Sequence, residues 1–386
     1  MKRNKPNIAI FHNYMDNIGG AEKFVLNTAK ELDSDIYTTN IDKKKIIKMN
    51  PDIDLSRIKS IGKVPLNSPY RQQLALFLFS RLNLKRKYDL YIIAGDWALS
   101  SALHNKPNIW YVHSPIREIW DLYSYVRKNI VRNWVFRILF DVWVKYNRYL
   151  NLKYVRHVNI LACNSINTQK RVKKYLNRDS VVLYSPLDVD KFQKKQKKEI
   201  YENLRQKIPK NYWLSVNRLF FHKRVEIQIE AFRNLPKEHL IIVGSYEKSK
   251  HFTEYAKKII RNKPKNVTIL SWVDDAKLIE LYKHCTGFIT TSQDEDFGIT
   301  PIEAMAAGKP VIAANEGGFK ETVINGKTGI LIDNITSKKL VIAIKKMALI
   351  LKNNPYAYEK NCLKRAKEFE TKKYVKNINK IISELI

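Results

Sequence analysis

Short runs of apolar residues alternate along the chain with longer stretches in which apolar and polar residues are mixed. Short apolar runs bounded by turn-forming residues are typical of strands that are buried in a parallel sheet. We expect such strands at Asn7–Asn13, Tyr88–Ala94, Asn108–His113, Val158–Asn164, Ser180–Tyr184, Tyr212–Val216, His239–Gly244, Asn266–Ser271, Gly287–Thr291, Pro310–Ala314 and Gly329–Ile332.

Several of the mixed stretches have the apolar spacing of helices. The clearest are Gly20–Leu32, Arg224–Asn234, Asp275–His284 and Pro301–Ala307, and the Lys-rich stretch 354–386 also has a helical pattern. Strands that alternate with helices predict βαβ units and parallel sheets.

A turn-like segment at 185–190 divides this pattern into two halves. A length of 386 residues also favours two domains over one. We therefore predict an α/β protein with one domain over residues 1–187 and another over 188–369. Two doubly wound halves joined at this point would face each other across a cleft.

The composition limits the cellular setting. No apolar run approaches the roughly 18 residues of a membrane-spanning helix, and the first apolar stretch ends at His12, too early for a signal peptide. The three cysteines are scattered, so neither a disulfide framework nor a zinc site is predicted. These features favour a cytoplasmic protein.

The charge is strongly positive, with 70 Lys and Arg against 37 Asp and Glu, a net charge of +33. Such a surface attracts polyanions, either nucleic acid or an anionic membrane. A compositional bias toward Lys, Asn and Ile would also explain the charge. No helix-turn-helix, zinc finger or single-strand platform is evident, and nucleic-acid binding rests on charge alone.

The segment 290–308 has the strongest chemical signal, because a strand end, an acidic loop and a helix follow one another there. Glu295 falls on the loop, at the sheet edge where α/β proteins bind ligands, and Glu303 falls in the first helical turn. The backbone N–H groups near Ile299 and Thr300 would point at an anion.

Helix capping and solvent exposure are alternative explanations for these two glutamates. Pro301 suits the first helical position, and Thr300 with Glu303 has the spacing of a capping box. Glu295 could equally belong to a solvated acidic loop.

Two cations follow the predicted strand that ends at Val216. Arg218 and Lys223 lie in the loop just before an amphipathic helix, where they could hold a diphosphate. In a chain this basic they could also be ordinary surface charge.

The first domain offers two weaker signals. Gly19 and Gly20 lie between a strand and a helix, where backbone can approach a ligand or simply turn. The pattern is not the dinucleotide fingerprint, so nicotinamide and flavin are not suggested. His113 follows a strand and could contact a sugar hydroxyl, carry a proton or serve a structural role.

Taken in order, these segments resemble glycosyltransferase family 4. The resemblance rests on Gly19-Gly20, on Arg218 and Lys223, on two glutamates separated by seven residues, and on a downstream run that includes Gly317-Gly318 and Glu321. It implies the GT-B architecture, with two facing Rossmann-like, doubly wound domains. The first would be the acceptor side, completed by a C-terminal helix over about 370–386, and the second would bind the donor nucleotide.

The resemblance also implies roles for single residues. The glycines would bring backbone to the donor phosphates, and Arg218 and Lys223 would neutralise the departing diphosphate. Glu295 would contact the donor sugar, Glu303 the ribose, and His113 would lie by the transferred sugar. The donor loop would further include Phe297, Gly298, Ile299 and Thr300. The family retains anomeric configuration and uses no bound metal, and the departing phosphate itself would accept the acceptor's proton.

Two stretches, 111–123 and 295–301, look like the mannosyltransferase branch that builds O-antigen and related polysaccharides. That branch implies GDP-mannose as donor and a lipid-linked saccharide or growing polysaccharide as acceptor. A UDP-sugar donor, a sugar-nucleotide epimerase and an inactive scaffold-like relative are the alternatives within this fold.

Aromatic and basic residues interleave over Ile130–Leu150, as they do in helices that lie at a membrane surface. We expect peripheral binding to the inner, anionic face of the cytoplasmic membrane. The alternative is a helix that packs on its own domain.

Overall fold

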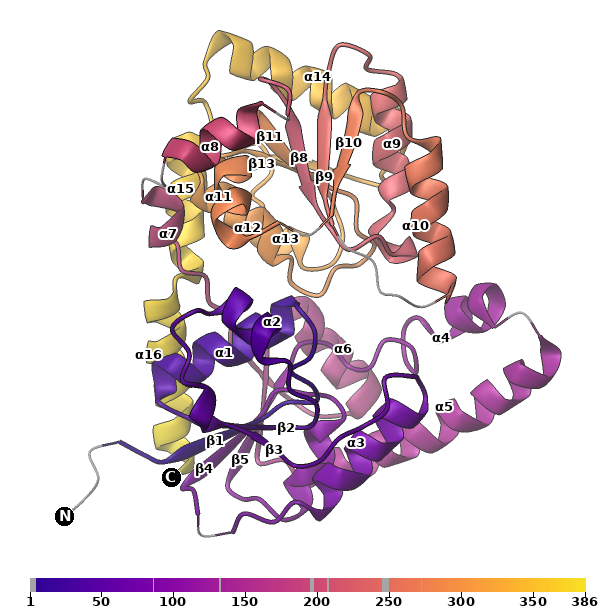
Figure 1. Cartoon of the computed structure of the whole chain (residues 1–386), viewed down its shortest axis with the longest axis vertical. Helices are drawn as coiled ribbons and strands as arrows, with labels where there is room; N and C mark the ends of the chain where they lie inside the picture. Colours follow the sequence, from indigo (N-terminus) through magenta and orange to yellow (C-terminus); the bar gives the residue numbers. More distant parts are fainter. Residues whose placement is uncertain are drawn as a thin grey trace. The chain divides into compact units, whose positions relative to one another are not determined.

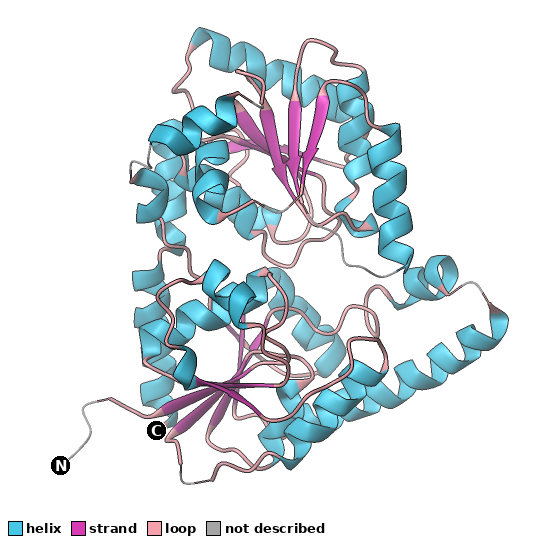
Figure 2. Ribbon diagram, in the orientation of Figure 1, coloured by secondary structure: helices cyan, strands magenta, loops and turns pink. Residues whose placement is uncertain are grey.

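The computed structural model describes residues 5–85, 87–131, 133–194, 198–206, 208–244, 250–271 and 273–386. The chain forms two compact units, one of Met1–Tyr184 with Tyr374–Ile386 and one of Ser185–Lys373. The chain leaves the first unit three residues before the predicted boundary at 187. Each unit is a parallel sheet flanked by helices (Figures 1 and 2).

The sheet of the first unit has the strand order β3-β2-β1-β4-β5-β6-β7, and all of its strands are parallel. Its strands are β1 (Ile8–Phe11), β2 (Asp35–Thr38), β3 (Ile58–Ser60), β4 (Leu90–Ile93), β5 (Asn108–Val112), β6 (Ile160–Cys163) and β7 (Val181–Val182). The order reverses between β1 and β4, as in doubly wound folds.

Helices and helical turns connect these strands. They are α1 (Gly20–Leu32), α2 (Lys43–Met49), η1 (Leu55–Arg57), α3 (Tyr70–Arg81), η2 (Ala98–Leu103), α4 (Tyr123–Tyr125), η3 (Val126–Ile130), α5 (Trp134–Val155) and α6 (Ile166–Leu176). The final helix, α16 (Thr371–Leu385), also packs in this unit, beside α1 in Figure 1.

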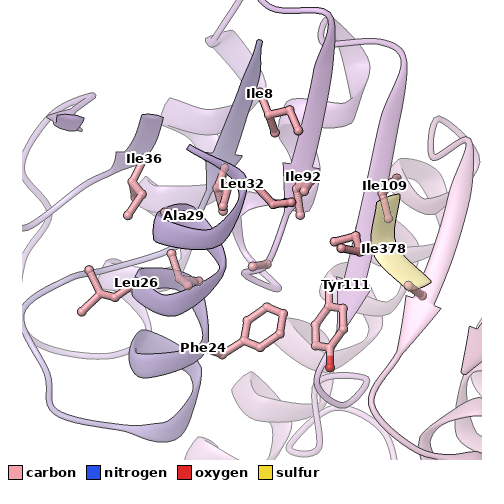
Figure 3. Packing of buried hydrophobic residues seen from close by; sticks show 14 of the residues in the cluster. Ile8, Phe24, Leu26, Ala29, Leu32, Ile36, Ile92, Ile109, Tyr111 and Ile378 are labelled. Atoms are coloured by element: carbon pink, nitrogen blue, oxygen red, sulfur yellow. The ribbon is translucent and has the colours of Figure 1, made fainter. Parts of the chain in front are cut away.

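Alternate residues of β1 contribute to two separate cores, because successive side chains of a strand point to opposite faces. Ile8 and Ile10 pack with α1 and α16, whereas Ala9 and Phe11 pack with α3 and α5. On the first face, Phe24 of α1 stacks on Tyr111 of β5 with ring centroids 4.1 Å apart (Figure 3).

The second unit repeats the pattern with the strand order β10-β9-β8-β11-β12-β13, again all parallel. Its strands are β8 (Trp213–Val216), β9 (Leu240–Val243), β10 (Val267–Leu270), β11 (Gly287–Thr290), β12 (Val311–Ala314) and β13 (Gly329–Ile332). Its helical elements are α7 (Asp190–Gln193), α8 (Lys198–Arg205), η4 (Phe221–Lys223), α9 (Val225–Arg233), α10 (Lys250–Asn262), α11 (Asp275–His284), α12 (Ile299–Ala306), α13 (Phe319–Thr322), α14 (Ser337–Asn353), α15 (Glu359–Ala366) and η5 (Lys367–Phe369).

Every strand expected from the sequence is present, and two more were missed. The missed strands β2 and β3 are only four and three residues long and contain Asp35, Lys59 and Ser60. Helix α5 begins at Trp134 instead of Ile130, because a π-helical turn precedes it and the Asn133 side chain caps it. The cysteines are all free and buried. Within the described residues, no helix is both long and apolar enough to cross a membrane.

Candidate functional site

The carboxyl ends of β8 and β11 form the point at which the strand order of the second sheet reverses. These two strands are parallel neighbours, so the loops that follow them leave the same edge of the sheet. Arg218 and Lys223 lie on the loop after β8, and Glu295 lies on the loop after β11. Open α/β sheets bind ligands at such a point.

Lys223 and Glu295, 72 positions apart in sequence, form an ion pair with 2.6 Å between Nζ and Oε2. Their side chains are only 17% and 19% exposed. Burial alone would raise the pKa of Glu295, but the charge and hydrogen bond of Lys223, with help from His222 and Ser292, lower that pKa to about 2. The carboxylate is therefore ionised at any physiological pH.

Arg224, the residue after Lys223, ties the two loops together. Its Nε donates to the carbonyl of Thr291 at 2.7 Å, and its Nη2 donates to the carbonyl of Ser292 at 3.2 Å and to the Glu316 carboxylate. Glu316 also accepts the backbone N–H of Asp294 at 3.2 Å. Neither Arg224 nor Glu316 was among the residues predicted from the sequence.

The Glu295 loop lies directly on the glycine pair 317–318. A Cβ at Gly317 would meet the Glu295 carbonyl oxygen at 2.5 Å, and one at Gly318 would meet the Phe297 Cα at 2.6 Å. The Gly318 N–H donates to that same Glu295 carbonyl at 2.8 Å. Only glycine allows the two backbones to come this close. Gly317 and Gly318 therefore determine how closely the Glu295 loop packs on the segment that contains them.

Helix α12 begins earlier than expected. Its first residue is Ile299 and its N-cap is Gly298, which has a φ of +84° and provides no side-chain cap. Pro301 is therefore the third helical residue instead of the first, and the predicted capping box of Thr300 and Glu303 is wrong because both residues lie inside the helix.

Glu303 is held by a neighbouring helix instead. Its Oε2 accepts a hydrogen bond from the hydroxyl of Tyr282 on α11 at 2.7 Å. Tyr282 is fully buried, and burial, followed by the nearby Glu303 charge, raises its pKa well above the usual value. Tyr282 therefore stays protonated and orients the carboxylate.

Arg218 lies where the β8 loop meets the end of β9. A Cβ at Gly244 would fall 1.8 Å from the carbonyl oxygen of Asn217, so the backbone beside Arg218 presses against that glycine. The Arg218 side chain is partly exposed.

The remaining predicted residues lie in the first unit. Gly19 is the N-cap of α1, and a Cβ on Gly20 would meet nothing within 4 Å. Packing of the described residues therefore does not require a glycine at position 20. The absence of a side chain there leaves open space beside the start of the helix.

His113 follows β5, with its ring edge-on to Phe24 and Tyr111 at 4.9 and 5.0 Å. Its Nε2 is buried and has no hydrogen-bond partner among the described residues. Burial chiefly, then the nearby His12, lowers the pKa of His113 to about 3, although Glu22 opposes them. The imidazole is therefore neutral.

His12 and Glu22 form a pair that was not predicted from the sequence. Both are buried, and His12 Nε2 lies 3.9 Å from a carboxylate oxygen of Glu22.

The residues predicted from the sequence form two groups, one at the carboxyl edge of each sheet. Arg218, Lys223, Glu295 and 297–303 belong to the second unit, and Gly19, Gly20 and His113 belong to the first.

Residues 196–369 match the family described as Glycosyl transferases group 1. The chain is 27% identical to the Alpha-1,3/1,6-mannosyltransferase ALG2 of Dictyostelium discoideum over 98% of both chains. It is 25% identical to ALG2 of Saccharomyces cerevisiae over 99% of this chain and 86% of that one.

Solved structures share the fold. Anabaena HepE, crystallised with UDP and glucose, superposes with a TM-score of 0.76 at 19% identity, covering 98% of this chain and all of HepE. WaaG, a glycosyltransferase involved in lipopolysaccharide biosynthesis, superposes with a TM-score of 0.69 at 16% identity, over 97% and 99% of the two chains. The predicted fold and enzyme class are confirmed: this chain is a glycosyltransferase with the GT-B fold, and its residues 196–369 match the group 1 glycosyl transferases.

Proposed function

We propose that the enzyme transfers a mannosyl residue from GDP-mannose to a lipid-linked saccharide, with retention of anomeric configuration and without a bound metal. The observation that carries the proposal is the mostly buried ion pair of Lys223 and Glu295 at the switch point of the second sheet. The choice of mannose is supported by the names of the full-length relatives and by the resemblance of 111–123 and 295–301 to mannosyltransferases.

The cations of the β8 loop would stabilise the departing diphosphate. At an effective dielectric constant near 20, one unit charge about 4 Å from a phosphate oxygen contributes about 4 kcal/mol. A lysine ammonium has three donor hydrogens, so Lys223 can hold Glu295 and a phosphate oxygen together. Arg218 lies on the same loop and would share the charge of the leaving group.

The acidic residues would hold the sugars of the donor. Glu295 is ionised and fixed by Lys223, which suits it to accept hydrogen bonds from hydroxyls of the transferred hexose. Glu303, oriented by Tyr282, would accept hydrogen bonds from the ribose. The loop from Phe297 to Thr300 opens α12, whose first N–H groups favour an anion.

The first unit would contribute neutral groups. His113 is uncharged, so it would act on the transferred sugar through a hydrogen bond and not as a cation. Gly19 is the N-cap of α1, and the open space beside Gly20 leaves room for a phosphate to approach the start of the helix. The oxygen of the departing phosphate would take the proton of the acceptor hydroxyl.

A lipid-linked acceptor would require the enzyme to work at a membrane surface. The net charge of +33 supports peripheral binding to the anionic inner face of the cytoplasmic membrane. A UDP-sugar donor is the second candidate, because HepE, with the same fold, was crystallised with UDP-glucose.

A thermal-shift screen against GDP, UDP, GDP-mannose and UDP-glucose would identify the donor, since a ligand that binds only the folded chain raises its melting temperature. Transfer of labelled mannose from GDP-mannose to lipid-linked saccharides then tests the reaction. We expect Glu295→Gln to reduce transfer at least a hundredfold, whereas Lys277→Ala on an exposed pair should leave it unchanged. Stabilisation by UDP alone would refute the GDP-mannose assignment, and full activity of Glu295→Gln would refute the site.

A further inference from the structure

Helix α5 exposes a continuous row of apolar side chains. Val135, Leu139, Val142, Tyr146 and Tyr149 recur at alternating spacings of four and three, which places them on one face of the helix. Their exposed fractions run from 43% to 61%. Among the described residues, no other helix exposes as many large apolar side chains. Exposed apolar surfaces of this extent mark interaction sites.

The opposite face of α5 already has its partners. Val144, Asn147 and Tyr154 are buried in the first unit, and the amide of Asn147 accepts a hydrogen bond from Gln73 of α3 at 2.9 Å. The two helices lie side by side in Figure 1. The apolar row therefore remains outside the core of its own unit.

Helix α3, the neighbour of α5, exposes a second, shorter row of apolar side chains. Tyr70, Leu74 and Phe77 follow one another at spacings of four and three and are 72%, 37% and 46% exposed. The guanidinium of Arg81 lies over the Phe77 ring, 4.6 Å from its centroid. We name these two rows of side chains, three on α3 and five on α5, the α3–α5 surface.

The charges around this surface are positive. Helix α5 carries four basic residues and one acidic residue, Asp141. The Asp141 carboxylate is held by Arg127 and by the hydroxyl of Tyr123, both at 2.8 Å, which compensates its charge. Lys153 continues the apolar row at its C-terminal end.

The combination of aliphatic, aromatic and basic groups fits one kind of partner best. Tyr and Trp side chains prefer the headgroup region of a bilayer, aliphatic groups prefer the acyl chains, and Lys and Arg attract anionic lipids. Trp134, at the start of α5 and one residue before the row begins, is 70% exposed. A nucleic acid would instead require several basic residues along the row, whereas the row has one, Lys153, at its C-terminal end.

We infer that the α3–α5 surface lies in the headgroup region of an anionic lipid bilayer and places the first unit at the membrane. The inference deepens the proposed function, because it supplies the route by which the enzyme would meet a lipid-linked acceptor. The binding itself does not depend on catalysis, so the two ideas can fail separately.

The test is flotation of the full chain with vesicles of phosphatidylglycerol and phosphatidylcholine, compared with phosphatidylcholine alone. The variant Val142→Glu/Tyr146→Glu places two acidic groups in the surface. The matched control, Ile342→Glu/Leu349→Glu, makes the same change in charge at two exposed positions of α14, 66% and 61% exposed. We expect the wild type and the control to float with anionic vesicles and the α5 variant to bind at least tenfold more weakly.

Two further readouts make the outcome decisive. Trp134 fluorescence should shift to shorter wavelength on vesicle binding, and Trp134→Phe should remove most of that shift. Equal flotation of the α5 variant and the control would overturn the inference. So would a wild-type dimer in light scattering that the α5 variant converts to a monomer, because a second copy would then cover the surface. Vesicle binding without mannosyl transfer would refute the proposed function alone.

Discussion

Replacing Lys223 with methionine removes the cation from a mostly buried pair and leaves the Glu295 carboxylate behind. Burial by itself raises the pKa of Glu295, and Lys223 is the main group that lowers it from 4.5 to about 2. The pKa in the folded chain lies below the ordinary value, so the pair stabilises the fold fully above about pH 4.5. That stability is lost as the pH falls toward 2.

The size of the effect follows from this shift. Each tenfold change in proton affinity corresponds to about 1.4 kcal/mol, so the lowered pKa represents about 3 kcal/mol at pH 7. Because a buried charge without its partner is costly in itself, the loss in Lys223→Met should be about 3 to 5 kcal/mol. In the variant the carboxyl pKa rises, so lowering the pH from 7 to 5 should recover part of the lost stability.

Hydrogen exchange measured by mass spectrometry can isolate the second unit within the full chain. Peptides from β8 and β11 report its opening free energy after correction for intrinsic exchange rates. Lys277→Met is the matched control, since its pair with Asp274 is 46% and 42% exposed and should contribute less than about 1 kcal/mol. Lys223→Met/Glu295→Gln should recover most of the loss. The reasoning fails if Lys223→Met behaves like the control, or if the double variant is no more stable than the single one.

Three further changes test other parts of the structure. Gly317→Ala should weaken donor binding and lower the melting temperature more than Gly326→Ala, because both glycines have positive φ (+58° and +77°) but only the first would clash with backbone; equal effects would contradict this. His113, with a pKa lowered to about 3, should stabilise the fold above pH 6.5 and lose that contribution as the pH falls toward 3. Its ring resonances, assigned with His113→Asn, should stay constant between pH 5 and 8, and a midpoint near 6.5 would refute the burial argument. Tyr374→Ala should destabilise the first unit by about 3 to 5 kcal/mol, because it removes a buried ring. Tyr374→Phe should cost only about 1 kcal/mol, and equal exchange rates of β1 peptides in the two variants would contradict this.

The location of the donor-site residues could be predicted because it depends on a general property of parallel sheets. Lys223 and Glu295 each follow a buried apolar strand, and all carboxyl ends of a parallel sheet lie at one edge. Their direct pairing could not be predicted, because it depends on how two loops fold against each other. Arg224 gave no signal among 70 basic residues.

Local patterns were misleading where tertiary contacts outweighed them. Thr300 and Glu303 have the spacing of a capping box, yet the left-handed Gly298 starts the helix earlier and Tyr282 binds the glutamate. In the same way, His12 and Glu22 meet only because β1 and α1 fold against each other. Such contacts leave no trace in a window of a few residues.

The placement of α16 sets an order for folding during synthesis. The second unit is one continuous stretch, Ser185–Lys373, so its core is complete once that stretch has emerged from the ribosome. The first unit is made earlier but lacks Tyr374, Ile378 and Ile382 until the end of α16 appears. Until then α1 and the sheet present an uncovered apolar face, and such faces attract chaperones and other nascent chains. The part of the enzyme that is translated first is therefore the last to become stable.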